Sequence, residues 1–142
     1  MYDAEGVFAV PGVPELLAKL DANKWTIVTA ATQALALTRL QQVNLPAPDT
    51  LVSAKDVEAG KPNPDCYLMG AERLGVEPKD TVVFEDAVNG VKAGHAAGAT
   101  VVGVLTSTTE ENLRQSGAQY VVSDFTRVCV EDKGEYLEIT IA

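Results

Sequence analysis

The sequence predicts an α/β fold with a mainly parallel sheet, helices on both faces and a C-terminal β-hairpin. Short apolar runs alternate with amphipathic segments along the chain, which is the order that strands and covering helices follow in layered α/β proteins. The apolar runs are rich in Val and Ile, as in strands that are buried on both faces. Residues 127–141 alternate apolar and polar side chains on both sides of EDKG, which indicates an antiparallel hairpin.

The first half of the chain alternates helices and strands. Residues 11–20 predict a helix, with Pro14 near its start and apolar side chains at helical spacing: Val13, Leu16, Leu17 and Leu20. The β-branched run WTIVT, residues 25–29, predicts a buried strand. The next helix is marked by apolar positions three or four residues apart, and it ends before NLPAP: Ala36, Leu40 and Val43. A brief strand at 51–52 follows.

The second half repeats this alternation. A helix through residues 67–74 ends at Gly75, and the runs at 81–85 and 100–105 predict buried strands. The segment between these strands is predicted to be helical, and its glycines at every fourth position indicate close packing on the sheet: Gly90, Gly94 and Gly98. A short helix and an edge strand at 119–122 precede the hairpin.

Composition favours one domain spanning residues 1–142 and excludes several function classes. The 46% apolar and 22% charged content is that of an ordinary globular chain. Acidic residues outnumber basic ones by 20 to 11, which argues against binding nucleic acid. No apolar run approaches the roughly 20 residues of a membrane span, and no secretory signal is visible. Two distant cysteines predict reduced thiols and a cytoplasmic protein, while one histidine disfavours a His-based hydrolase.

Three groups of polar residues fall where strands end or loops turn, which is where ligands bind in such sheets. Thr29 ends the predicted strand over residues 25–29, and its alternative role is a helix N-cap or turn residue. Lys61 lies between Gly60 and a proline, and the alternative is a solvated loop lysine. Glu85 and Asp86 leave a buried strand together, a pattern that suits Mg²⁺, although Asp86 could instead cap the next helix.

The order of these three groups along the chain resembles that of a known protein family. A strand ending in Thr, then GKPNPDCY, then VVFEDAVNGVKAGHAAG, resembles the haloacid dehalogenase superfamily. The similarity is greatest to its sugar-phosphatase branch, related to β-phosphoglucomutase and to fungal glycerol-3-phosphate and 2-deoxyglucose-6-phosphate phosphatases. It runs from about Val10 to the end of the chain. The resemblance implies a Rossmann-like core.

The resemblance also implies roles for the polar residues. Thr29, helped by the backbone N–H of Ala30, would bind the transferring phosphoryl group, and Lys61 would balance its negative charge. Asp86, with Glu85 beside it, would hold Mg²⁺. Phosphoryl transfer depends on this kind of positioning and charge stabilisation. The implied partner is a small phosphorylated metabolite.

The first residues depart from the family pattern. The family carries a nucleophile motif, D-x-D-x-T, at the end of a first central strand, followed by a helical cap. Here Asp3 is followed by Glu5 and Val7, with no apolar strand before it. Residues 1–10 are therefore expected to be the residual linker from cap to core, with the central strand and the cap missing.

Two consequences are expected. The strands ending at Thr29 and Glu85 would pair with each other, be bridged by residues 5–10, or leave open edges through which the protein could associate. The chain would be a Mg²⁺-dependent phosphatase of small sugars or polyols by family, inactive alone because the aspartate nucleophile is absent. The alternative is a non-catalytic phosphate- and Mg²⁺-binding remnant or regulatory protein. A phosphoacceptor receiver domain fits less well, because the order Thr, Lys, acidic pair departs from its pattern.

Overall fold

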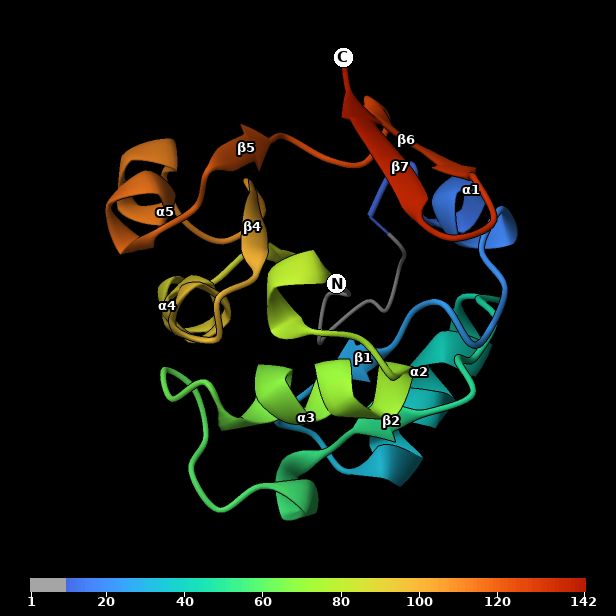
Figure 1. Ribbon diagram of the computed structural model, residues 1–142, viewed down its shortest axis with the longest axis horizontal. Coiled ribbons are helices and arrows are strands. Elements are labelled where there is room, and N and C mark those ends of the chain that lie inside the picture. The colour runs from blue at the N-terminus through green and yellow to red at the C-terminus, as the bar shows by residue number, and fades with distance from the viewer. Residues whose placement is uncertain (1–9) are drawn as a thin grey trace.

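The computed structural model describes residues 10–142, which form an α/β arrangement of parallel strands and surrounding helices (Figure 1). Two parallel sheets and one antiparallel hairpin make up the β-structure. The two-stranded sheet contains β1 (Ile27–Val28) and β2 (Leu51–Val52), and the three-stranded sheet contains β3 (Val82–Glu85), β4 (Thr100–Val104) and β5 (Tyr120–Val122) in the order β3-β4-β5. The hairpin contains β6 (Val128–Asp132) and β7 (Leu137–Ile141).

Within residues 10–142, five α-helices and two short 3₁₀ helices accompany these strands. They are α1 (Val13–Ala18), α2 (Gln33–Gln42), η1 (Ala54–Asp56), α3 (Asp65–Leu74), η2 (Pro78–Asp80), α4 (Val88–Ala96) and α5 (Glu110–Ser116). The predicted fold class, the alternation of elements, the edge position of residues 120–122 and the C-terminal hairpin are confirmed. The strand predicted over residues 25–29 is shorter than expected, with only Ile27 and Val28 paired.

Helices cover both faces of the sheet, as β4 shows. Successive side chains of a strand point to opposite faces. Val101 packs in a cluster with Val91 of α4 and Leu113 of α5. Its neighbour Val102 packs in a second cluster to which α1, α2 and Phe125 contribute. A strand buried on both sides in this way explains the continuous apolar run at 100–105.

The parallel sheet is divided between β1 and β3. Within residues 10–142, β1 pairs with β2 alone and β3 pairs with β4 alone. The expectation that β1 and β3 pair with each other is therefore wrong, since no ladder joins them among these residues. Whether residues 5–9 bridge the two edges lies outside the described residues, as does Asp3 and all but the last residue of the predicted linker 1–10.

Helix α3 joins the two parallel sheets. It contacts β1, β2 and α4 and lies across the shorter sheet (Figure 1). A Cβ on Gly70 would lie 3.2 Å from Val28 Cγ2, so the glycine lets α3 approach β1 closely. Ile27 of β1 and Phe84 of β3 also pack against the same core cluster. Within residues 10–142, helix packing and a shared core cluster hold the two sheets together, and no hydrogen-bonded ladder joins them.

The repeated glycines of α4 have two different roles. A Cβ on Gly94 would lie 2.9 Å from Val101 Cγ2, so close packing on the sheet is confirmed there. Gly98 instead has φ +90° after the end of the helix, with no atom near a hypothetical Cβ. Because glycine adopts this left-handed conformation without strain, the chain can turn here into β4. Across the part of the chain that the structure describes, no helix is long and apolar enough to cross a membrane.

Candidate functional site

Lys61 and Glu85 form an ion pair at the carboxyl end of β3. Glu85 is the last residue of that strand and is only 9% exposed. Lys61 lies in the loop between η1 and α3, after Gly60 and before Pro62, and its Nζ is 2.5 Å from Glu85 Oε1. The interpretation of Lys61 as a purely solvated loop residue is therefore wrong, because its ammonium group pairs with a buried carboxylate.

Tyr67 completes this cluster from the first turn of α3. Its hydroxyl donates a hydrogen bond of 2.5 Å to the same oxygen, Glu85 Oε1. Lys61 Nζ also lies 5.2 Å from the centre of the Tyr67 ring. Burial raises the pKa of Tyr67, and the negative charge of Glu85 raises it further. The phenol is therefore held in its neutral form, in which it can donate to the carboxylate.

The polar role of Tyr67 was not predicted, since the sequence indicated only that it lies in a helix over residues 67–74. The signal that could have revealed it is the helix start directly after the lysine loop, in KPNPDCY. Pro64 is the N-cap of α3, so Tyr67 lies in the first turns, beside the loop that carries Lys61. A phenol there can reach the polar group that the lysine also contacts. Figure 1 shows this loop leading directly into α3.

Asp86 follows Glu85 but is held by a different element. Its Oδ2 accepts hydrogen bonds from Thr106 Oγ1 at 3.1 Å and Ser107 Oγ at 2.6 Å. The suggestion that Asp86 caps α4 is wrong, because the N-cap residue is Ala87 and no side chain caps that helix. The two hydroxyls were not predicted. They follow the apolar run of β4, so they lie at the same edge of the sheet as the end of β3.

Thr29 lies at the carboxyl end of β1 and makes a turn there. Its N–H donates to the carbonyl of Val52 at 2.9 Å, and its Oγ1 accepts from the N–H of Ala31 at 3.0 Å. The N-cap of α2 is Thr32, so the turn alternative for Thr29 is confirmed and the cap alternative is wrong. Ala30, which follows, is exposed.

The structure brings together part of the predicted set. Lys61 and Glu85 are in direct contact, and Asp86 is the next residue in the chain. Thr29 and Ala30 belong to the other parallel sheet, also at the carboxyl end of their strand. Among the described residues, no hydrogen bond joins these two groups. The arrangement is a cationic and acidic cluster at one sheet and a hydroxyl turn at the other.

An open surface hollow of about 520 Å³ is lined by none of the predicted site residues. It lies between the first turns of α2 and the start of η1. Its lining residues are Thr32, Gln33, Ala34, Leu37, Ser53, Ala54 and Lys55.

Comparison with known proteins identifies the family. Residues 2–98 match the model of a family described as haloacid dehalogenase-like hydrolase. The chain belongs to the haloacid dehalogenase-like hydrolases. Hexitol phosphatase A of Escherichia coli strain K12 is 44% identical over 72% of this chain and 48% of its own length. The 2-deoxyglucose-6-phosphate phosphatase 2 of Saccharomyces cerevisiae is 35% identical over 91% of this chain and 60% of its own length.

Solved haloacid dehalogenase-like structures share the fold. A HAD family hydrolase from Deinococcus radiodurans R1, with bound phosphate and sodium, is 33% identical with a TM-score of 0.75, covering 82% of this chain and 56% of that one. The β-phosphoglucomutase of Clostridium difficile is 29% identical with a TM-score of 0.70, covering 82% and 50%. The chain thus spans about half the length of the relatives it matches. The predicted resemblance to this family and to its sugar phosphatases is confirmed.

The carboxylates of this haloacid dehalogenase-like hydrolase have the chemistry that Mg²⁺ prefers. No group of three or more His, Cys, Asp or Glu side chains gathers within residues 10–142. Mg²⁺, however, is usually held by one or two carboxylates together with water and substrate phosphate. Asp86 offers Oδ1, which accepts no hydrogen bond from the described residues, whereas the Oε1 of Glu85 is taken by Lys61 and Tyr67. The donor set fits a cation held mainly through Asp86.

Proposed function

We propose that this chain carries the phosphoryl- and cation-binding part of a Mg²⁺-dependent phosphatase of small phosphorylated sugars or polyols. The observation that carries the proposal is the Lys61–Glu85 pair, with Asp86 next to it, at the carboxyl end of β3. Family membership supports it, as do relatives named hexitol phosphatase and 2-deoxyglucose-6-phosphate phosphatase.

Each residue then has a role that follows from its chemistry. Lys61 places a positive charge where phosphoryl oxygens would bind, and Glu85 with Tyr67 fixes the direction of its ammonium group. The hydroxyl of Thr29 and the N–H of Ala30 would donate hydrogen bonds to those oxygens. Asp86, with Glu85 beside it, would hold Mg²⁺. A bound Mg²⁺ would supply charge stabilisation for the phosphoryl group.

The proposal is tested by binding and by turnover. Calorimetry with inorganic phosphate, with and without Mg²⁺, is expected to show binding that Mg²⁺ strengthens. Lys61→Met should weaken phosphate binding by about tenfold or more, because a charge-assisted contact is lost. The matched control is Lys79→Met, which removes an exposed lysine from η2. Absence of phosphate binding in the wild-type chain would overturn the proposal.

A second candidate is a non-catalytic protein that binds phosphate and Mg²⁺. It is favoured by the first residues of the sequence, where Asp3 is followed by Glu5 and Val7 and so departs from the D-x-D-x-T nucleophile motif of the family. Turnover of p-nitrophenyl phosphate separates the candidates: binding without turnover selects the second, and Mg²⁺-dependent turnover lost in Lys61→Met selects the first. Loss of turnover in Asp3→Ala would identify Asp3 as the nucleophile.

We also propose the setting in which the chain works. Two free cysteines, Cys66 and Cys129, support a reducing cytoplasm. The strand edges of β1 and β3 that have no partner within residues 10–142 support association through added strands. Light scattering coupled to gel filtration is expected to show a species larger than the 15.0 kDa chain. A strictly monomeric chain at high concentration would contradict the association.

A further inference from the structure

We propose that Arg73 and Asp56 are positioning residues that hold the Lys61 loop against α3. The inference rests on the proposed role of Lys61 in binding a phosphoryl group. Neither Arg73 nor Asp56 belongs to the cluster around Glu85, and neither contacts Lys61. They act on the segment from which Lys61 projects.

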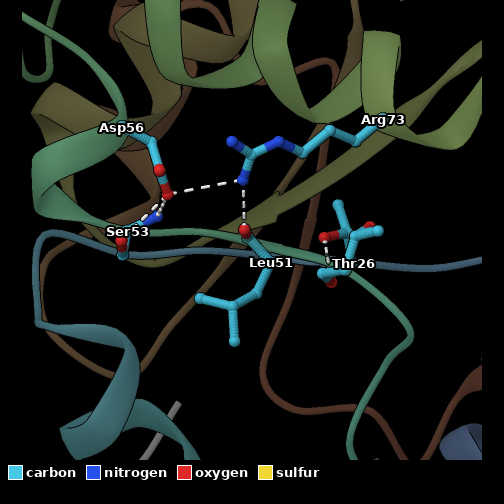
Figure 2. Close-up of polar contacts among 6 residues, drawn as sticks. Thr26, Leu51, Ser53, Asp56 and Arg73 are labelled. Carbon is cyan, nitrogen blue, oxygen red and sulfur yellow. Dashed lines mark hydrogen bonds and ion pairs between the residues drawn. The ribbon is translucent and has the colours of Figure 1, made fainter.

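The central contact of this arrangement is one guanidinium nitrogen. Figure 2 shows Arg73 Nη1 pointing at the end of β2, where it donates to the carbonyl of Leu51 at 2.5 Å. The same nitrogen lies 3.3 Å from Asp56 Oδ2 in η1. Arg73 is in the last turn of α3, so the helix reaches back to the strand exit and to the turn that follows it.

The Asp56 carboxylate accepts hydrogen bonds both from Arg73 of α3 and from Ser53 of its own turn. Besides Arg73, its Oδ2 accepts from the N–H of Ser53 at 2.7 Å and from the Ser53 hydroxyl at 2.9 Å. Ser53 is only 1% exposed, so the start of this turn is buried in the protein. The hydrogen bond from the Ser53 N–H, followed by that from Arg73, lowers the pKa of Asp56 from 3.8 to about 2. The carboxylate is therefore charged throughout the neutral range.

These contacts fix the Lys61 loop at both ends. The loop leaves η1 at Asp56 and enters α3 at Asp65, and Arg73 of that helix binds the turn where the loop begins. Inside the loop, Asn63 donates its N–H and its side-chain amide to the carbonyl of Gly60, each at 3.0 Å. A loop tied at both ends to one helix has few alternative conformations.

Helix α3 therefore determines both sides of the Lys61 contact. Tyr67, near its start, orients the carboxylate of Glu85 that Lys61 binds. Arg73, near its end, restrains the loop that delivers the ammonium group. Removing the Arg73 contacts should leave the Lys61 side chain intact but let it adopt more positions. A smaller fraction of the protein molecules would then hold the ammonium group where an anion binds.

The test compares Arg73→Gln with Arg73→Lys and Arg114→Gln. Arg114→Gln is the matched control, because it breaks another arginine–carboxylate pair, with Glu110, within α5. Arg73→Gln is expected to weaken inorganic phosphate binding about tenfold, the scale found when residues supporting a ligand's contacts are removed. Arg73→Lys should retain part of the wild-type phosphate affinity because it keeps the positive charge. Arg114→Gln should have the same phosphate affinity as the wild type.

A double-mutant cycle separates positioning from general support of the fold. If Arg73 acts through Lys61, Arg73→Gln should cause no further loss of phosphate affinity in a Lys61→Met background. Equal losses in both backgrounds would overturn the proposal. Amide hydrogen exchange gives a readout that needs no ligand: the amides of Asp56 and Asn63 should exchange faster in Arg73→Gln, while those of β4 stay unchanged.

The exchange experiment keeps this inference separate from the proposed function. If the wild-type chain binds no phosphate, the proposed function fails, and exchange alone then decides whether Arg73 orders the loop. Unchanged exchange at Asp56 and Asn63 in Arg73→Gln would overturn the inference even if phosphate binds. Equal acceleration in the loop and in β4 would also overturn it, since Arg73 would then support the whole domain.

Discussion

The carboxylate of Glu85 occupies the space that a side chain at Gly90 would need. A Cβ at position 90 would lie 2.1 Å from Glu85 Cδ and 2.1 to 2.4 Å from its two oxygens. Glu85 is the last residue of β3, and Gly90 lies in the first turn of α4. The buried ion pair with Lys61 therefore depends on a helix position that has no side chain at all.

We expect Gly90→Ala to destabilise the protein. Alanine in a helix is favoured over glycine by about 1 kcal/mol. The methyl group would displace a carboxylate that accepts from Lys61 and Tyr67, and hydrogen bonds to charged groups contribute about 1.5–3 kcal/mol each. The loss exceeds the gain, so urea unfolding should show a net loss of about 2 kcal/mol. Gly60→Ala is the control, since open space surrounds that position; a stabilised Gly90→Ala would contradict the packing.

Lys61→Met is expected to lower the free energy of unfolding by about 3 kcal/mol, because it leaves a buried carboxylate without its cation. Adding Glu85→Gln should recover part of the loss, since the double variant carries no unpaired charge there. Denaturant unfolding of both single variants and the double variant measures the coupling. Additive losses would mean that the pair contributes nothing as a pair.

Tyr67→Phe should change how stability depends on alkaline pH. The pKa of Tyr67 is raised in the folded protein from the ordinary value of 10.0. Above pH 10 the unfolded chain loses the phenol proton while the folded chain keeps it, so stability present below pH 10 declines as pH rises. The Phe variant lacks this decline. Unfolding measured from pH 8 upward tests it, with exposed Tyr136→Phe as control; parallel profiles for Tyr67→Phe and wild type would contradict the assignment.

Ser107→Ala should weaken Mg²⁺ binding about tenfold, because a hydroxyl that orients Asp86 is removed. Calorimetric titration with Mg²⁺ measures the affinity, and Ser107→Thr should retain most of it. Ser123→Ala removes an exposed serine with no side-chain hydrogen bond in the described part of the chain, so its affinity should match that of the wild type. Equal Mg²⁺ affinity in Ser107→Ala and Ser123→Ala would contradict a role for the Ser107 hydroxyl in orienting Asp86 for Mg²⁺.

Asp56→Asn is expected to make the free energy of unfolding depend less on pH below pH 4. The pKa of Asp56 falls from 3.8 to about 2 on folding, so its contribution is complete above pH 4 and is lost as pH falls towards 2. Thermal unfolding between pH 2 and pH 6 measures the difference between the variant and the wild type. Asp49→Asn is a suitable comparison because no hydrogen bond to its side chain occurs in residues 10–142; equal profiles for the two variants would contradict the role of Ser53 and Arg73.

Much of the fold could be predicted because its elements have strong local patterns. The apolar run of β4 and the alternating hairpin at 128–141 were recognised from periodicity, and both formed as expected. Lys61 and Glu85 were predicted to be site residues from the order of motifs, but they were not predicted to be direct partners. Their contact joins positions 24 apart in the chain. Local periodicity contains no information about which distant side chains meet.

The chain by itself determined the α/β class, the order of elements and the polar residues at the strand ends. These follow from hydrophobic period, turn residues and the placement of charge after buried strands. Tertiary structure alone decided that Tyr67 shares the carboxylate of Glu85 and that Ser107 rather than a helix terminus holds Asp86. It also decided that β1 and β3 do not pair with each other within residues 10–142. Each of these depends on packing between elements, where the need to satisfy buried polar groups selects partners far apart in sequence.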